Sequence, residues 1–590
     1  MLLDVWGVTR PRPFQVDAIY QLAFRRLPMT YLIRKTGEGK SLVLLGTATI
    51  LRGVTISMVP LIGLGSDQVA KSKCKKEGVE AYHLDEFRGN NFDKLKSRLD
   101  CFRKDTRKSI ILYVSPQMLK KDSMWSDTLL TLARQGQLSA FCVDEAHTVV
   151  DNYESFRPEF KAGIDFVNEL NTVSNNQHPN LKLPILAMSA TFRQPHQDAF
   201  SKLINRQPDL VMWGPMDRRS IRINVDIAGQ PIALIKASLI EYYKAHTEQQ
   251  VLVYTNSKKA ADGSLYEMAD KIVDNLNARE DVNTKNEVLC LTGDCGIMMK
   301  TYLMESFCND GNLGDDISPN TDGEEGTNLP HVSIMPCTSA AQCGISSKRC
   351  SRAYRYGPPP NMNDLVQEMG RVDRSHNAAP GDHGYFFHMN FDTYINLFIR
   401  TQCERNPIVR KRLEEELHRV LTFLNLPSQC YHVMLEEFLE NPSTYKEREP
   451  CGHLCPFCTG NYKTFSNAVN RDVLLKLLRA KIFLKGSIPA DTFVTFLNDK
   501  QNQHTLKGQI WGKGSKSLPT GKIHGLVLML FASGAVKLSV RDKKRIGKDF
   551  VRMKDVDVSL GTCTVPGDDG DEMEDLVMSQ ETTFSQFTFK

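Results

Sequence analysis

The sequence predicts an α/β protein with two parallel sheets, followed by a helical subdomain and a basic C-terminal domain. Short apolar runs alternate with helical patterns through the first 200 residues, and again between about residues 251 and 388. This alternation is typical of parallel sheets. With 590 residues, 41% of them hydrophobic and 24% charged, the chain has the composition of a globular protein and the length of about four domains. Beyond residue 400 the pattern changes to an amphipathic helix at 410–424, a group of cysteines and a lysine-rich region.

Short apolar runs are the candidate strands of the two sheets. In the first region they lie at 31–33, 54–59, 110–114, 140–143 and 185–188, and in the second they begin at 251 and continue at 288–291, 332–335 and 385–388. Ligands of such sheets bind at the carboxyl ends of the strands, so polar residues that follow these runs are the candidate site residues.

Several classes of protein are disfavoured by the sequence. The N-terminus lacks the basic, apolar and small-residue pattern of a signal peptide. The most apolar stretch, 42–64, is interrupted by Arg52 and fits a helix followed by a strand better than a membrane span. Fifteen cysteines without a secretory signal do not indicate a disulfide framework. We therefore expect no membrane partner.

The formal net charge of +5 conceals strong local patterning. Residues 461–550 hold 17 Lys and Arg against 5 Asp and Glu. Residues 309–330 hold six acidic residues and no basic one, and the last 40 residues hold nine acidic against three basic. The basic block is where we expect duplex nucleic acid to bind, and the acidic segments are expected to be a solvated insertion and a disordered tail.

A glycine-rich segment, TGEGKS at 36–41, follows the first candidate strand and precedes an apolar helical run. Glycines let successive backbone N–H groups point at phosphate oxygens, while Lys40 would reach the β- and γ-phosphates and Ser41 would hold Mg²⁺. A chance glycine-rich turn is the alternative. Glu38 would place a carboxylate beside an anion site, which is tolerable only if it points to solvent.

Paired carboxylates end a second apolar strand, in the sequence FCVDEAH at 141–147. Asp144 is placed to hold the Mg²⁺ shell, and Glu145 to orient or deprotonate an attacking water. A simple helix cap is the alternative, but the phosphate loop about 100 residues earlier favours nucleotide hydrolysis.

Two arginines in the second α/β region, Arg371 and Arg374, are three residues apart and are expected to share one helix face. They would stabilise charge on the γ-phosphate in the transition state, as an arginine finger does. A solvated arginine helix is the alternative.

Four cysteines have the spacing of a structural zinc site. Cys430 is followed by Cys451, Cys455 and Cys458, and four thiolates suit a closed tetrahedral Zn²⁺. His453 lies inside the group as a rival ligand, and buried cysteines without a metal are the alternative.

This ordered set of motifs resembles the RecQ-type DNA helicases of helicase superfamily 2 over roughly residues 10–460. The matching segments are the Q motif at 12–15, motif I at 36–41, motif Ia at 59–62 and 67–69, the next strand-contact motif at 114–117, DEAH at 144–147, motif III at 189–191, motif IV at 254–257, motif V at 337–345 and motif VI at 367–374. FRPEF at 156–160 is similar to that family's FRPEY segment, and the cysteine group is similar to its zinc knuckle.

The resemblance implies ATP, Mg²⁺ and Zn²⁺ as cofactors and assigns the site residues. Those that bind the nucleotide and its metal are Arg12, Gln15, Thr36, Gly37, Glu38, Gly39, Lys40, Ser41, Asp144 and Gln367. The catalytic residues are Lys40, Asp144, Glu145, Arg371 and Arg374, and the zinc ligands are Cys430, Cys451, Cys455 and Cys458. The candidate DNA-binding residues are Tyr153, Phe156, Arg157, Lys543, Lys544 and Arg545, the last three being equally compatible with a nuclear import signal or a solvated face.

The resemblance also implies the domain order and the activity. The expected parts are a RecA-like lobe at 1–225, a second at 226–400 with the acidic insertion 309–330, a helical zinc-binding subdomain at 401–465, a winged-helix-like domain at 466–560 and an acidic tail at 561–590. The implied activity is ATP-driven 3′–5′ translocation on single-stranded DNA with unwinding of duplex DNA, in repair, recombination or replication. The expected location is the nucleus, or the cytoplasm or nucleoid of a cell without one.

Two other functions stay open. Asn152 and Glu154 stand where the family carries the aromatic loop that senses DNA, and Ser346 and Asp373 depart from motifs V and VI. These changes motivate a catalytically weakened scaffold that binds DNA. An RNA helicase is the other alternative, which the cysteine group and the segment 156–160 disfavour.

Overall fold

The computed structural model describes residues 2–60, 65, 68–69, 72, 78–87, 89–103, 108–153, 158–179, 183–216, 218–227, 229–280, 286–308, 331–342, 345, 347–372, 379–439, 448–460, 468–481, 486–511, 521–541, 546 and 551–560. The chain divides into two compact units, and each is described by itself. The first comprises Met1–Asp217, Gly296–Thr301 and Leu435–Glu447, and the second comprises Arg218–Cys295, Tyr302–Met434 and Arg448–Lys590. Among the described helices, none combines the length and the apolar character that crossing a bilayer requires.

Lobe 1, the α/β part of the first unit, contains a seven-stranded parallel sheet with the order β3-β4-β2-β5-β6-β1-β7. Its strands are β1 (Met29–Ile33), β2 (Gly53–Met58), β3 (Val79–His83), β4 (Ser109–Val114), β5 (Leu138–Asp144), β6 (Ile185–Ser189) and β7 (Leu210–Trp213). All five strands expected from apolar runs are present. The two that were missed, β3 and β7, are the edge strands, which are only partly buried and therefore lack a continuous apolar run.

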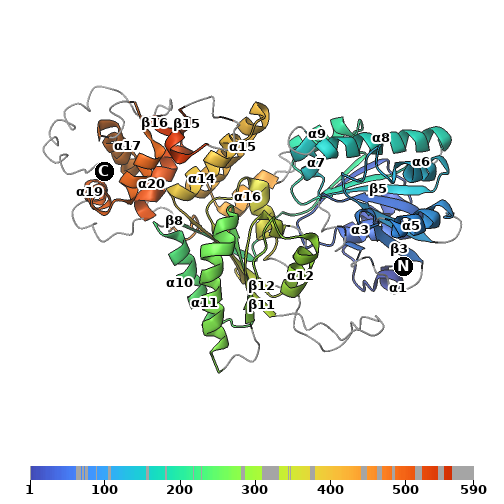
Figure 1. Ribbon diagram of the computed structural model, residues 1–590, viewed down its shortest axis with the longest axis horizontal. Helices are drawn as coiled ribbons and strands as arrows, with labels where there is room; N and C mark the ends of the chain where they lie inside the picture. Colours follow the sequence, from blue (N-terminus) through green and yellow to red (C-terminus); the bar gives the residue numbers. More distant parts are fainter. Residues whose placement is uncertain are drawn as a thin grey trace. The chain divides into compact units, whose positions relative to one another are not determined.

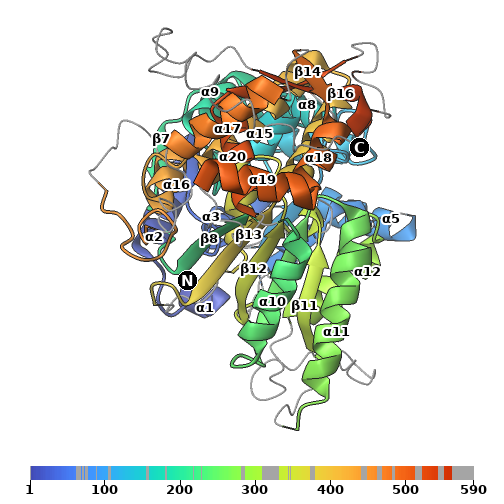
Figure 2. The same ribbon diagram turned by 90° about the vertical axis from the view of Figure 1, so that its left-hand side faces the viewer.

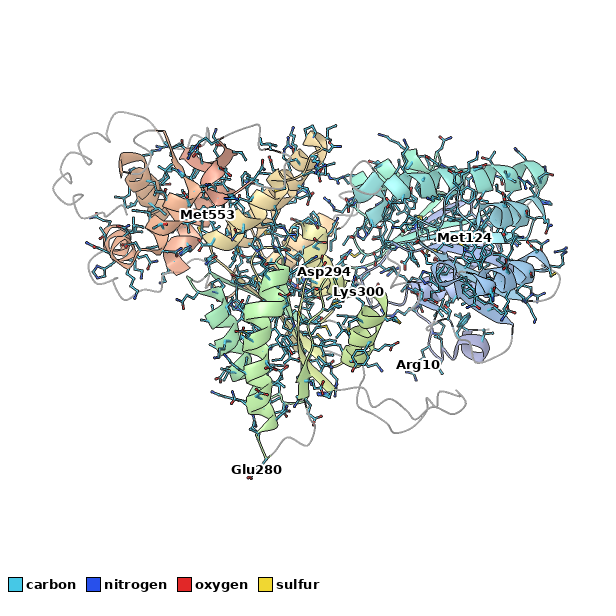
Figure 3. All side chains as sticks on the ribbon, viewed as in Figure 1. Arg10, Met124, Glu280, Asp294, Lys300 and Met553 are labelled. Atoms are coloured by element: carbon cyan, nitrogen blue, oxygen red, sulfur yellow. The ribbon has the colours of Figure 1, made fainter. Side chains whose placement is uncertain are left out.

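Helices cover both faces of this sheet (Figure 1). They are α1 (Leu2–Trp6), α2 (Pro13–Ala23), α3 (Ser41–Leu51), α5 (Asn90–Asp100), α6 (Ser126–Arg134), α7 (His147–Tyr153), α8 (Pro158–Gln177) and α9 (Gln194–Leu203), with a 3₁₀ turn η1 (Leu84–Glu86) after β3. The helix α3 packs on β2, β4 and β5, and buries Val43, Leu44 and Ala48 against α2 and the sheet. Side chains crowd the space between the sheet and its helices (Figure 3).

Lobe 2, the α/β part of the second unit, contains a six-stranded parallel sheet with the order β10-β11-β9-β12-β13-β8. The strands are β8 (Ile221–Ile227), β9 (Gln250–Thr255), β10 (Asn286–Val288), β11 (His331–Cys337), β12 (Cys350–Tyr356) and β13 (His383–Met389). The run expected at 288–291 begins two residues earlier, and Leu291 forms only an isolated bridge with Cys337.

The helices α10 (Pro231–Tyr243) and α11 (Tyr266–Asn277) lie beside the lobe 2 sheet (Figure 2), and their apolar residues form one core with β9, β10 and β11. The other elements between β9 and the cysteine group are the π-helical turn η3 (Ala260–Leu265), α12 (Ile297–Cys308), the 3₁₀ turn η4 (Ser339–Gln342), α13 (Met362–Met369), α14 (Phe391–Gln402), α15 (Pro407–Asn425) and α16 (Tyr431–Leu439). The helices α12 and α16 each have residues in both compact units. The amphipathic helix expected at 410–424 is α15.

The C-terminal part of the second unit combines helices with a three-stranded antiparallel sheet of order β14-β16-β15. Its elements are α17 (Ala468–Lys481), β14 (Ser487–Pro489), α18 (Ala490–Asn498), α19 (Lys500–Trp511), α20 (Gly521–Ala532), β15 (Val536–Val540), the 3₁₀ turn η8 (Met553–Asp555) and β16 (Val556–Leu560). The apolar helix α20 is buried along its whole length and packs on α15, α17 and β8. The predicted fold class, α/β with two RecA-like parallel-sheet lobes and helical content, is confirmed, while the winged-helix-like character expected of 466–560 stays a prediction.

Candidate functional site

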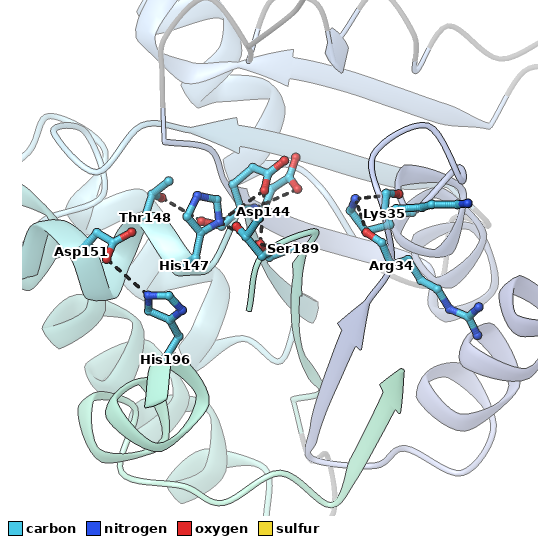
Figure 4. A network of polar contacts seen from close by, with 11 residues as sticks. Arg34, Lys35, Asp144, His147, Thr148, Asp151, Ser189 and His196 are labelled. Carbon is cyan, nitrogen blue, oxygen red and sulfur yellow. Dashed lines mark hydrogen bonds and ion pairs between the residues drawn. The ribbon is translucent and has the colours of Figure 1, made fainter. Parts of the chain in front are cut away.

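The sequence-predicted nucleotide residues of lobe 1 meet at the carboxyl edge of its sheet. Lys40 follows β1, Asp144 ends β5 and Ser189 ends β6, and these three strands are neighbours in the sheet. Figure 4 shows Asp144, Ser189 and His147 grouped together, with the loop of Arg34 and Lys35 beside them. Parallel strands therefore bring residues more than 100 positions apart in the chain to one edge.

The loop 36–41 has the backbone shape that its glycines permit. Gly37 and Gly39 have φ values of +92° and +79°, which residues with a side chain rarely adopt. The ammonium group of Lys40 donates hydrogen bonds to the carbonyl oxygens of Arg34 at 2.9 Å and Lys35 at 3.5 Å. The Lys40 side chain is thus folded back over its own loop.

The Q-motif helix α2 contacts this loop through Gln15. Its amide nitrogen donates to the carbonyl oxygens of Gly39 at 2.9 Å and Glu38 at 3.3 Å, and its amide oxygen accepts from the backbone N–H of Arg12 at 2.7 Å. Gln15 is 4% exposed. The sequence prediction placed Gln15 and Arg12 at the nucleotide, and the structure brings both to the phosphate loop.

Glu38 corrects one sequence expectation. Its carboxylate does not point to solvent, because the residue is only 7% exposed and its Oε1 lies 3.4 Å from Nη1 of Arg12. The guanidinium of Arg34 in turn lies 4.1 Å from the ring centre of Phe14. Arg12, which directly precedes α2, therefore pairs with the carboxylate that stands in the glycine loop.

The paired carboxylates occupy a strained turn directly after β5. Glu145 has a φ of +47°, in the left-handed region, and its backbone N–H donates to Oδ1 of Asp144 at 3.0 Å. The other Asp144 oxygen accepts from the amide of Gln68 at 3.4 Å. Because of this positive φ, the Glu145 side chain does not continue the direction of β5. The carboxylates of Asp144 and Glu145 therefore contact different residues.

A polar network that the sequence motifs did not specify joins Glu145 to Ser189 and His147, and Figure 4 shows the last two. The Ser189 hydroxyl lies 2.8 Å from Nδ1 of His147 and 3.3 Å from Oε2 of Glu145, to which it donates. Nδ1 of His147 lies 3.5 Å from the same carboxylate oxygen. Burial lowers the pKa of His147, so its neutral form is favoured near neutral pH. Ser189 belongs to motif III and His147 to the DEAH segment, and this was the only indication of these contacts in the sequence.

The residues of this edge fit a nucleoside triphosphate with its metal. The loop offers backbone N–H groups at the start of α3, and the Thr36 hydroxyl is buried without a hydrogen-bond partner among the described atoms. Ser41 is the first residue of α3, and Asp144 is the last residue of β5. Ser41 and Asp144 are oxygen donors of the kind that Mg²⁺ prefers, and Mg²⁺ bound there would neutralise phosphate charge.

Motif VI of lobe 2 differs from the sequence expectation. The helix α13 contains Gln367, which is 8% exposed, and ends before Gly370. Arg371 lies in the turn that follows, is 6% exposed and donates from Nη1 to the carbonyl oxygen of Ile345 at 3.1 Å. The expectation that Arg371 shares a helix face with Arg374 is therefore wrong for Arg371, and Arg374 is outside the described residues.

A buried ion pair under motif VI was missed from the sequence. Arg355 on β12 and Glu368 on α13 are each 1% exposed, and Nε lies 3.4 Å from Oε2. The Tyr385 hydroxyl donates to the same carboxylate oxygen. The arginines of β12 interrupt its apolar run, so the sequence did not predict this strand. This pair ties α13 to two strands of the sheet.

The four predicted zinc ligands come together in the second unit. The sulfur atoms of Cys430, Cys451, Cys455 and Cys458 all lie within 4.8 Å of one another, and those of Cys430 and Cys455 are 3.8 Å apart. A tetrahedral Zn²⁺ with Zn–S bonds of about 2.3 Å separates its sulfurs by about 3.8 Å, whereas a disulfide bond measures about 2.05 Å. Hydrogen bonds from neighbouring thiols lower the pKa of Cys430, which favours a thiolate. His453 is exposed and is not one of the clustered ligands.

The cysteine group is anchored to lobe 2. Leu454, between two of the ligands, accepts a hydrogen bond from the Ile223 N–H of β8 at 2.8 Å. Its side chain lies against Gly381, where a Cβ would approach Leu454 Cδ2 to 2.8 Å. The donor set and the sulfur spacing fit Zn²⁺, with Cys430, Cys451, Cys455 and Cys458 as its ligands.

The candidate DNA-binding residues are not placed. Phe156, Arg157, Lys543, Lys544 and Arg545 lie outside the described residues, as do Asn152's side chain, Glu154, Ser346 and Asp373. Tyr153 ends α7, but its side chain also lies outside the described part. The acidic segments 309–330 and 561–590 are likewise outside it.

Comparison with known proteins identifies the first lobe. Residues 12–199 match the family described as DEAD/DEAH box helicase. A protein named putative ATP-dependent RNA helicase R290, from Acanthamoeba polyphaga mimivirus, is 24% identical over 88% of this chain and 84% of its own length. The ATP-dependent DNA helicase RecQ of Bacillus subtilis is 22% identical over 78% of this chain and 66% of its own, and the RecQ-like DNA helicase blm-1 of Caenorhabditis elegans is 31% identical over 28% and 15%. The chain thus spans less than two thirds of the length of these two RecQ proteins.

Solved helicase structures also match at low identity. The Mycobacterium smegmatis helicase Lhr bound to ssDNA and AMP-PNP matches with a TM-score of 0.46 and 13% identity, over 94% of this chain and 59% of that chain. The DEAD-box helicase Mss116 bound to ssRNA matches with a TM-score of 0.47 and 15% identity, over 75% and 85%. Residues 12–199 therefore match the DEAD/DEAH box helicase family, and RecQ helicases are similar to the chain at low identity over much of its length.

Proposed function

We propose that this protein is an ATP-dependent DNA helicase of RecQ type, which moves 3′–5′ along single-stranded DNA and separates the strands of a duplex. The observation that carries the proposal is the assembly, at one edge of lobe 1, of the glycine loop with Lys40 and the carboxylates Asp144 and Glu145. These residues supply phosphate binding, metal binding and a base, which are the three elements of nucleoside triphosphate hydrolysis.

Lys40 and Glu145 have separate roles in the proposed reaction. When the phosphates of ATP enter the loop, Lys40 exchanges its bonds to the carbonyl oxygens of Arg34 and Lys35 for bonds to the β- and γ-phosphates. Glu145 accepts a proton from the attacking water, and the Ser189 hydroxyl and His147 fix the orientation of its carboxylate. Arg371, with Arg374, is proposed to stabilise the charge that develops on the γ-phosphate.

The four-cysteine group supports the RecQ assignment over other superfamily 2 helicases. The resemblance to RecQ proteins includes this zinc knuckle, and the group is docked on β8 through the hydrogen bond between Leu454 and Ile223. We propose that the basic region 461–550 grips duplex DNA and that Tyr153, Phe156 and Arg157 contact the single strand. Repair, recombination or replication in the nucleus is the proposed setting.

An RNA helicase is the second candidate. It is favoured by the mimiviral relative, whose printed name is that of an RNA helicase and of which the chain spans 84%. The experiment that separates the two measures unwinding of matched DNA and RNA duplexes with 3′ or 5′ single-stranded overhangs. The proposal expects ATP-dependent unwinding of the DNA duplex with a 3′ overhang. Preferential unwinding of RNA, or of the 5′ overhang, would contradict it.

A further inference from the structure

A buried arginine joins three segments of lobe 2. Arg355 is the last residue but one of β12 and is 1% exposed. Its Nη2 donates hydrogen bonds to Oδ1 of Asn256, which directly follows β9, and to the carbonyl oxygen of Pro358 at 3.3 Å. Its Nε lies 3.4 Å from Oε2 of Glu368 on α13. One guanidinium group therefore contacts the ends of two neighbouring strands and the helix of motif VI.

The partners of Arg355 are themselves held in place. The side-chain amide of Asn256 donates to the Pro358 carbonyl oxygen at 2.7 Å. The Tyr385 hydroxyl, from β13, donates to Oε2 of Glu368. Burial and the neighbouring carboxylate raise the pKa of Tyr385, so its hydroxyl keeps the proton that it donates. The carboxylate of Glu368 is thus oriented by side chains from β12 and β13, which pair in the sheet.

Glu368 also belongs to the turn that carries Arg371. The backbone N–H of Arg371 donates to the Glu368 carbonyl oxygen at 3.0 Å. The guanidinium of Arg371 donates to the carbonyl oxygen of Ile345 at 3.1 Å. A shift of the end of α13 would therefore carry Arg371 with it. The contacts of the Glu368 side chain with the sheet fix where Arg371 lies on lobe 2.

Stability alone does not account for a buried ion pair at this place. Removing two charges from water costs much of what their attraction returns, and apolar residues of similar size are often as stable in their place. An ion pair adds direction instead, because the planar guanidinium group and the carboxylate bond only in particular geometries. Arg355 and Glu368 are each 1% exposed, so this directional contact is made inside the lobe.

We propose that Arg355 and Glu368 are positioning residues for ATP hydrolysis, which hold the motif VI turn so that Arg371 keeps a fixed place on lobe 2. This inference rests on the proposed function, in which Arg371 stabilises charge on the γ-phosphate. Both residues act through Arg371 and not on the substrate. Their effect on the rate is large, because a misplacement of about 1 Å can slow a reaction by about 100-fold.

The test measures kcat and KM for ATP with saturating single-stranded DNA, at a temperature well below the melting temperature of every variant. Arg355→Lys should lower kcat by about tenfold or more and change KM little, because one ammonium group cannot contact both Asn256 and Glu368. Tyr385→Phe, a milder change, should lower kcat by about threefold, since Glu368 loses one hydrogen bond.

The chain offers a matched control for each variant. Arg352→Lys makes the same change on the same strand, where the guanidinium lies 3.9 Å from the ring centre of Tyr242. Tyr243→Phe removes another buried hydroxyl of lobe 2, which donates to the Ser333 carbonyl oxygen at 2.9 Å. Both controls should keep the wild-type kcat, and they show how much a loss of stability alone changes the rate.

A double-mutant cycle tests whether the two residues act through Arg371. In an Arg371→Ala background, Arg355→Lys should lower kcat little further, because no arginine is left to position. Wild-type kcat in Arg355→Lys and Tyr385→Phe, an equal loss in the controls, or a full further loss in the Arg371→Ala background would each overturn this inference and leave the proposed function intact. A wild type whose ATPase does not depend on Lys40 would overturn both.

Discussion

The side-chain amide of Gln15 donates a hydrogen bond to the Gly39 carbonyl oxygen across 2.9 Å, which joins the helix α2 to the phosphate loop. Gln15 is the residue that the sequence assigns to nucleotide binding, and Gly39 stands directly before Lys40, the lysine proposed to bind phosphate. The contact leaves no room at Gly39, where a Cβ would lie 2.6 Å from Nε2 of Gln15. This pair therefore links the packing of α2 to the loop that contains Lys40.

The first prediction concerns that pair. Gly39→Ala should weaken ATP binding and lower the free energy of unfolding by about 1–2 kcal/mol, because alanine is strained at a φ of +79° and collides with Gln15. Nucleotide titration and thermal unfolding measure the two effects. Gly508→Ala is the control, since no heavy atom lies within 4 Å of the added methyl and α19 should tolerate or prefer alanine. Equal ATP affinity in both variants would show that the close approach at Gly39 is unimportant.

Glu145→Gln should separate ATP binding from ATP hydrolysis. The substitution removes the proposed base but leaves Lys40 and the loop intact, so hydrolysis should slow by about 10²–10⁴-fold while ATP still raises the melting temperature. Single-turnover hydrolysis and thermal shift measure this. A variant that hydrolyses ATP at the wild-type rate would remove Glu145 from the mechanism.

The cysteine group should bind one zinc ion per chain. Elemental analysis of Cys455→Ser should show that zinc is lost, and the second unit should melt at a lower temperature, because the group joins α16 and the knuckle to β8. His453→Ala should retain full zinc content, because His453 is exposed and outside the sulfur cluster. Zinc loss in His453→Ala, or none in Cys455→Ser, would contradict the ligand set.

Buried histidines of the second unit should make it sensitive to acid. Burial lowers the pKa of His388 to about 3 and that of His524 to about 4. Below pH 6.5 the unfolded state therefore binds protons that the folded state does not, and each histidine lowers the free energy of unfolding by up to about 1.4 kcal/mol per pH unit. Asp226 opposes this trend, since burial raises its pKa to about 6 and the folded state takes up its proton first.

The measurement compares melting temperatures at pH 7.5 and 5.5. His388→Phe should show a smaller fall than the wild type, because the aromatic ring keeps its stacking on Tyr354 and no longer titrates. An identical fall in His388→Phe and the wild type would show that His388 does not contribute.

Local patterns predicted most of what positions the nucleotide residues. An apolar run that ends in glycines or carboxylates is recognisable within ten residues, and it placed Asp144 and Glu145 at the end of β5 and Lys40 in the loop between β1 and α3. Contacts that depend on the packing of distant elements were not predictable. The Arg12–Glu38 pair requires α2 to lie over the loop, and the Arg355–Glu368 pair requires a charged residue on a central strand. The lobe 1 edge strands β3 and β7 were missed for a different reason, because they are only partly buried and need no continuous apolar face.

The central claim is that nucleic acid drives a Lys40-dependent ATPase. Steady-state ATP hydrolysis should be measured with and without single-stranded DNA, for the wild type and for Lys40→Ala. We expect DNA to stimulate the wild type and Lys40→Ala to lose about 100-fold or more of the stimulated rate, since Lys40 binds the phosphates during hydrolysis. A Lys40-dependent rate that DNA does not change would contradict the account and favour a DNA-binding scaffold.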